Sequence, residues 1–124
     1  MHARVVIAGG AAPVRAAIVA ALRAAGFLVA AECSDAGTAV AAVARERPDV
    51  CVIDADLPGG ALVAAAAISS PSVPPPVLVL DADGTDGTSR AAELAGATAS
   101  LRGRLDEDRL ADAVAEVLRA DHHH

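Results

Sequence analysis

The sequence predicts a doubly wound α/β fold, in which helices cover both faces of one parallel sheet. Five short apolar runs alternate along the chain with five segments of helical periodicity. Because the connections are short, the helices must carry right-handed crossovers between parallel strands. Two of the runs, VCVID and VLVL, contain no polar residue before their carboxyl ends, which is typical of strands buried on both faces.

Strands are expected where apolar and β-branched residues dominate a short run. The third run closes on an acid, Asp54, and the fourth is followed directly by another, Asp81. The fifth run is the weakest of the set. In chain order, the runs cover residues 4–8, 27–32, 50–54, 77–80 and 98–101.

Each expected helix has a recognisable start or stop signal. Ser34 or Asp35 can cap the second helix, and Pro48 stops it. Gly26 and Gly96 end the first and the fourth. Three acids at 106–108 complement the dipole at the start of the last helix. In chain order, the helices cover residues 13–25, 36–46, 60–68, 85–95 and 105–118.

Length and composition restrict the class of protein. The 124 residues suit one domain, taken as 1–121, and the final histidines at 122–124 are interpreted as the remnant of a purification tag. No apolar stretch is long enough for a bilayer, and no secretory signal opens the chain, so a cytoplasmic protein is expected. The net charge is −6, and the ten basic residues, all Arg, form no cluster with aromatic residues. Direct binding to nucleic acid is therefore not expected.

Two further features are interpreted as structural. Cys33 and Cys51 lie near the ends of apolar runs, without a basic or helix-start neighbourhood, so we expect buried, unreactive thiols. The segment SSPSVPPP, residues 69–76, has the composition of a polyproline ligand for a partner module. A stiff surface loop is the more common role of such a segment.

The residues that end the strands are the candidate site, because ligands of parallel sheets bind beyond the carboxyl ends of the strands. Two glycines follow the first strand, where such proteins usually place polar chemistry. Acids end the third and fourth strands, and arginines follow the fifth. In chain order, these residues are Gly9, Gly10, Asp54, Asp56, Asp81, Asp83, Arg102 and Arg104.

Several segments resemble response-regulator receiver domains, the phosphoacceptor modules of two-component signalling. PDVCVIDADLPGG is similar to their third strand and following loop, and GFLVAAECSDAGTAVAAVARERPDV to the preceding segment of the NarL/FixJ (LuxR-type) group. VLVLDA and AAELAGATASL resemble the fourth strand, fourth helix and fifth strand. The resemblance covers residues 3–119. It implies a CheY-like (βα)5 sandwich whose five parallel strands have the flavodoxin-like order 2-1-3-4-5.

The resemblance assigns Asp54 to the position of the phosphoacceptor aspartate. The two acids that hold Mg²⁺ in the family become Gly9 and Gly10, and glycine has no side chain with which to coordinate a cation. Asp54 and a backbone carbonyl near Asp56 would be left to hold an ion that takes hard oxygen ligands in octahedral geometry. We therefore expect that Mg²⁺ is lost as a cofactor and that the chain has no catalytic or metal-binding residue.

The other positions that the resemblance implies also differ from the family. The hydroxyl residue becomes Asp81, the lysine becomes Gly103, and the aromatic switch residue becomes Ser100. Since the third and fourth strands should be neighbours, Asp54 and Asp81 should repel each other, by roughly 3 kcal/mol at about 6 Å and an effective dielectric of about 20. A phosphoryl group on Asp54 would add negative charge, and the chain contains no Lys to offset it.

The leading hypothesis is an atypical receiver domain of a bacterial two-component-type transcriptional regulator, which is not an enzyme and signals without ordinary Mg²⁺-dependent phosphorylation. The expected partners are a DNA-binding output domain in a longer chain, a second copy, a sensor kinase or a small ligand. The alternative keeps phosphorylation of Asp54, with neighbouring acids forming a rearranged cation site. A third hypothesis is that the glycine pair binds the phosphate of a nucleotide, but the segment GGAAPV does not match the nucleotide-binding motif GxGxxG.

Overall fold

One parallel sheet of five strands forms the centre of the computed structural model, which describes residues 2–71, 73–81, 91, 93–102 and 106–121. Its order, β2-β1-β3-β4-β5, confirms the predicted fold class. The strands are β1 (Arg4–Ala8), β2 (Leu28–Cys33), β3 (Val50–Asp54), β4 (Val77–Asp81) and β5 (Ala99–Arg102).

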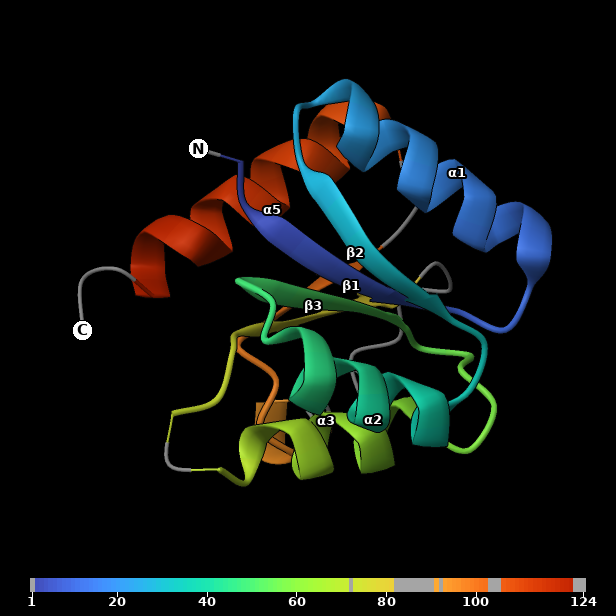
Figure 1. The fold of residues 1–124 in the computed structure, drawn as a ribbon, viewed down its shortest axis with the longest axis vertical. Coiled ribbons are helices and arrows are strands. Elements are labelled where there is room, and N and C mark those ends of the chain that lie inside the picture. Colours follow the sequence, from blue (N-terminus) through green and yellow to red (C-terminus); the bar gives the residue numbers. More distant parts are fainter. Residues whose placement is uncertain (1, 72, 82–90, 92, 103–105, 122–124) are drawn as a thin grey trace.

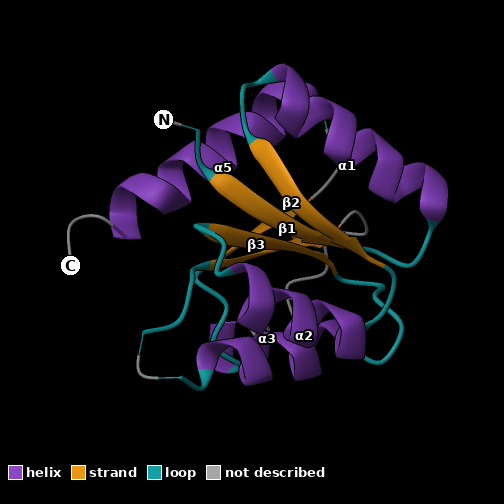
Figure 2. Ribbon diagram, in the orientation of Figure 1, coloured by secondary structure: helices purple, strands orange, loops and turns teal. Residues whose placement is uncertain are grey.

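Helices cover both faces of this sheet, as a doubly wound fold requires. Figure 1 shows α1 and α5 on one face and α2 and α3 on the other. The same three layers are visible in Figure 2, where the strands lie between two sets of helices. The described helices are α1 (Ala12–Ala24), α2 (Ala36–Glu46), α3 (Ala61–Ser69) and α5 (Glu107–Asp121).

The bounds of β1, β3 and α2 match the predicted ones. Those of α5 differ by two residues at its start and three at its end, and the other elements described at both ends differ by one residue. β2 begins after Phe27, because the Phe27 N–H donates to the Leu22 carbonyl and closes the end of α1. α3 begins after Gly60, whose φ of +101° is not helical. Most of the helix predicted at 85–95 lies outside the described residues, and Ala91, Glu93 and Leu94 are helical.

Two apolar cores result from the alternation of side chains along the strands. Val52 and Leu78 pack in the core beneath α1 and α5, whereas Ile53 and Val79 pack in the core beneath α2 and α3. Leu110, Val114 and Val117 of α5 are buried in the first of these cores, and Leu118 packs against it.

The cysteines confirm the prediction of buried thiols. Cys33 and Cys51 are free and buried. Burial raises the pKa of the Cys33 thiol, and it raises the pKa of Cys51 to about 12. Both thiols therefore remain protonated near neutral pH, where a thiolate would be the nucleophile. In the part of the chain that the structure describes, no helix is long and apolar enough to cross a membrane.

Candidate functional site at the carboxyl edge of the sheet

Asp54 ends β3 at the centre of the sheet and is partly buried. Its register partner on β4 is Leu80, and the Ala55 N–H donates to the Leu80 carbonyl at 2.8 Å. Two hydrogen bonds connect the turn after β3 to Asp54. The Asp56 N–H donates to Asp54 Oδ1 at 3.2 Å, and the Leu57 N–H donates to the Asp54 carbonyl at 3.0 Å. The Asp54 carboxylate thus accepts a hydrogen bond from the loop that follows it.

Gly9 lies directly beside Asp54. Its N–H donates to the Cys33 carbonyl at 2.9 Å, which extends the β1–β2 pairing by one residue. A β-carbon at Gly9 would lie 3.5 Å from the Asp54 Cβ and 3.9 Å from Asp54 Oδ2. These are ordinary van der Waals separations, so position 9 has room for a side chain next to the Asp54 carboxylate.

Position 10 has no such room. A β-carbon at Gly10 would lie 2.5 Å from Cδ and 2.8 Å from Cγ of Pro58, so the proline ring occupies the space that a side chain would need. The Pro58 carbonyl accepts a hydrogen bond of 2.8 Å from the Ala36 N–H at the start of α2. Since this bond anchors the loop after β3, a side chain at position 10 requires displacement of an anchored backbone.

Arg15 brings a positive charge to the end of β1. Its Nη1 donates to the Gly9 carbonyl at 2.7 Å, and its Nε lies 3.9 Å from Oε1 of Glu32. Sequence analysis did not identify this residue. A signal was present, because the first turn of α1 contains no acid, although acids are favoured at the positive end of a helix dipole. The basic side chain of Arg15, six positions after Gly9, can instead donate a hydrogen bond to a carbonyl at the end of β1.

Asp81 ends β4 beside the end of β3, as predicted. It is 5% exposed, and its register partner is Arg102, the last residue of β5. Ser100 is partly buried within β5 and pairs with Val79. The predicted site residues Gly103, Asp83 and Arg104 lie outside the described residues.

Comparison with known proteins decides the family. Residues 5–115 match the response regulator receiver domain family. The chain is a receiver domain of this family. No curated protein matches the sequence.

Solved receiver domains have the same fold as this one. The signal receiver domain of the response regulator NarL from Mycobacterium tuberculosis is 27% identical, with a TM-score of 0.89 over 95% of this chain and 97% of that one. A two-component response regulator of the LuxR family from Aurantimonas sp. SI85-9A1 is 26% identical, with a TM-score of 0.87 over 97% of this chain and 87% of that one. A response regulator from Chloroflexus aurantiacus, 22% identical with a TM-score of 0.90 over 96% and 99% of the two chains, shares the fold.

The described residues at this edge of the receiver domain offer few ligands for an Mg²⁺ ion. Among the described residues, no group of three or more His, Cys, Asp or Glu side chains is placed to hold a metal ion. Gly9 and Gly10 offer no side-chain oxygen, and the space at Gly10 is filled by Pro58. Asp56 is exposed, and its N–H donates to Asp54 Oδ1. Mg²⁺ requires octahedral oxygen ligands, and this donor set is poor in them.

Proposed function

We propose that this receiver domain transmits its signal by binding a partner, without Mg²⁺-dependent phosphorylation of Asp54, as part of a bacterial transcriptional regulator of the NarL/LuxR type. The observation that carries the proposal is the contact of Pro58 with Gly10. The space beside a metal-binding acid at position 10 is filled by a proline ring.

Phosphoryl transfer to a carboxylate depends on charge neutralisation. The incoming group and the Asp54 carboxylate are both negative, and bound metal ions supply most of the compensation at such sites. Arg15 is a cation at the end of β1, but its guanidinium is engaged by the Gly9 carbonyl and lies near Glu32. Its planar donors also differ from the compact charge of a metal ion.

Asp81 adds a second unfavourable factor. It is buried at the end of the strand next to Asp54, in the position where the family has a hydroxyl group that donates a hydrogen bond to the phosphoryl group. A carboxylate there repels a phosphoryl group instead. The two factors are independent, because one concerns a missing ligand and the other a like charge.

The similar structures support particular partners. Relatives above 25% identity are described as a NarL receiver domain and as a LuxR-family response regulator. For this chain we propose a DNA-binding output domain in the full-length regulator as the recipient of the signal. A sensor kinase, a second copy or a small ligand would provide the input.

Intact-mass spectrometry after incubation with acetyl phosphate and Mg²⁺ tests the proposal. We expect no phosphoryl adduct on the wild-type protein and none on Asp54→Asn, which is the control for labelling elsewhere. An adduct on the wild type that Asp54→Asn removes would overturn the proposal and support the alternative, a phosphorylatable receiver with a rearranged acidic cation site.

A gain-of-function series sharpens this test. We expect Gly9→Asp/Gly10→Asp to bind Mg²⁺ weakly while Pro58 fills the space at position 10. Adding Pro58→Ala should open that space and strengthen Mg²⁺ binding, measured by calorimetry. Equal Mg²⁺ affinity in the double variant and in the triple variant would contradict the role given to Pro58.

A further inference from the structure

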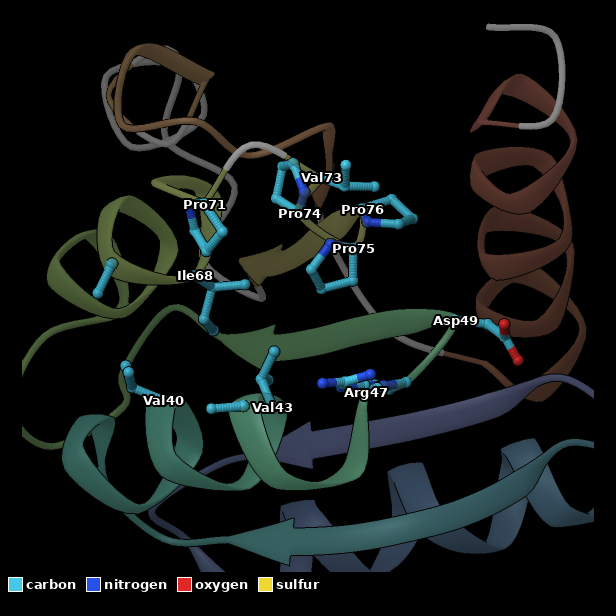
Figure 3. Close-up of a pocket in the computed structure, with 13 residues that line it drawn as sticks. Val40, Val43, Arg47, Asp49, Ile68, Pro71, Val73, Pro74, Pro75 and Pro76 are labelled. Carbon is cyan, nitrogen blue, oxygen red and sulfur yellow. The ribbon is translucent and has the colours of Figure 1, made fainter.

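A cavity of about 610 Å³ lies at the amino edge of the sheet, opposite the candidate site. Figure 3 shows it between the C-terminal ends of α2 and α3, under the segment that leads into β4. Its walls are mainly apolar, with Val40 and Val43 from α2 and Ile68 from α3. Cavities of about 300–1,000 Å³ with apolar walls and few polar groups are typical of small-molecule sites.

Four prolines, each with a fixed φ, contribute to the remaining wall. They belong to the segment that was interpreted as a surface loop and are Pro71, Pro74, Pro75 and Pro76. The last of these is held to the sheet, because the Cys51 N–H donates to the Pro76 carbonyl at 3.0 Å.

Arg47 supplies the positive charge of this cavity. It follows the last residue of α2, and in Figure 3 its guanidinium extends into the cavity beneath Pro75. Among the described residues, no acid pairs with it. The nearest acids in sequence are engaged elsewhere. Glu46 pairs with Arg4 at 3.1 Å, and Asp49, which also lines the cavity, accepts the Arg4 N–H at its Oδ2 at 2.8 Å.

The backbone conformation of Arg47 does not require an arginine, although a cation at the C-terminus of α2 complements the helix dipole. Its φ of +48° places it in the left-handed conformation that ends many helices. Glycine adopts this conformation without a steric cost, and it is the usual residue at such a helix end. The left-handed conformation at this helix end would therefore favour glycine, whereas the long cationic side chain of Arg47 lines the cavity.

We propose that this cavity binds a small amphiphilic carboxylate, whose apolar body lies against Val43, Ile68 and the prolines and whose carboxylate pairs with the Arg47 guanidinium. A single planar guanidinium matches one carboxylate in a bidentate pair. A doubly charged phosphate would require further cations, which the described walls of the cavity do not provide. The proposal does not depend on the function proposed for the carboxyl edge.

Nuclear magnetic resonance titration with octanoate, below its micelle concentration, tests the proposal. We expect saturable shifts of the backbone amides of Val43, Ile68 and Val73, with at least tenfold weaker binding of octanol and of octyltrimethylammonium. Equal affinity for octanol would overturn the role of Arg47, and the absence of octanoate binding at these residues would overturn the site. Concentration-dependent shifts of the same amides without any ligand would assign the surface to a second copy and would also overturn it.

Arg47→Gly separates binding from folding. Because glycine suits the left-handed backbone, we expect this variant to have a higher Tm than the wild type and at least tenfold lower affinity for octanoate. Arg23→Gln is the matched control, since Arg23 lies in the last turn of α1 on the other face of the sheet. It should bind octanoate like the wild type. Unchanged affinity in Arg47→Gly would overturn the proposal.

Discussion

The two edges of the sheet differ in how closely their loops pack. At the carboxyl edge, Pro58 packs against Gly10, and Arg15 donates to the Gly9 carbonyl. At the amino edge, the proline-rich segment before β4 stands away from α2 and leaves a cavity. The difference shows that glycine in place of a larger residue can close a site, because the chain around Pro58 can then approach the glycine closely. A stiff connection, in contrast, keeps a space open.

The largest expected effect separates the two glycines of the carboxyl edge. Gly10→Ala should destabilise the domain by about 1–3 kcal/mol, because its β-carbon overlaps the anchored Pro58 ring. Gly9→Ala should have the opposite sign and stabilise it by about 0.4–1 kcal/mol, since a β-carbon there meets only ordinary contacts. Urea unfolding of both variants provides the measurement.

Pro58→Ala is the control for this comparison. In the double variant with Gly10→Ala, the cost should be smaller than the sum of the two single costs, because the clash is shared. Equal stabilities of Gly9→Ala and Gly10→Ala would show that the carboxyl edge is not closed by this contact.

The next effect concerns the like charges at the carboxyl edge. Asp81→Asn should stabilise the domain near neutral pH by about 1 kcal/mol, because it replaces a carboxyl group by an amide at the buried strand end beside Asp54. The gain should shrink in an Asp54→Asn background. An unchanged or lower Tm for Asp81→Asn would count against repulsion between the two strand ends.

A smaller effect is expected from α2, which runs between the two edges. Asp35 caps its N-terminus, and hydrogen bonds from the Thr38 N–H and hydroxyl lower the pKa of the Asp35 carboxyl. A lowered pKa adds stability above the unfolded value of about 3.9, and this stability is lost as the pH falls through the folded pKa. Asp35→Ala should therefore lower the Tm at pH 7, and the Tm of this variant should fall less steeply than that of the wild type as the pH is lowered.

Thermal scans from pH 7 to pH 2.5 provide the measurement for Asp35. Asp112→Ala is a suitable control, because Asp112 of α5 is exposed and does not cap a helix. Asp49→Ala is less suitable, because the Asp49 side chain also accepts a backbone N–H. If Asp35→Ala and the wild type lose stability in parallel on acidification, the cap is not the cause.

The smallest expected effect lies in the core between the two edges. Cys51 is fully buried, and burial raises its pKa to about 12, so maleimide should label this thiol at pH 8 only as fast as the domain unfolds. Arg47→Gly should not accelerate this labelling. Rapid native labelling of Cys51 would indicate that the amino-edge cavity opens into the core.

Local patterns were sufficient to predict the strands and their parallel arrangement in one sheet. Continuous apolar runs located β1 and β3 to the residue, and strand–helix alternation predicted a parallel sheet. Asp54 and Asp81 were placed at neighbouring strand ends, because an acid that follows a buried strand must emerge at the carboxyl edge. Ends governed by turns were predicted less well, as at Phe27, where a hydrogen bond to Leu22 belongs to α1.

By itself, the sequence determined the fold class, the strand order through family resemblance, and the absence of side chains beside Asp54, since these depend on periodicity and residue identity. Only the tertiary structure decided what occupies the resulting spaces. The contact of Pro58 with Gly10 joins residues 48 positions apart, and the open cavity beside Arg47 is lined by α2, α3 and the loop before β4. Such contacts depend on how loops pack across the finished sheet, and no local pattern encodes that packing.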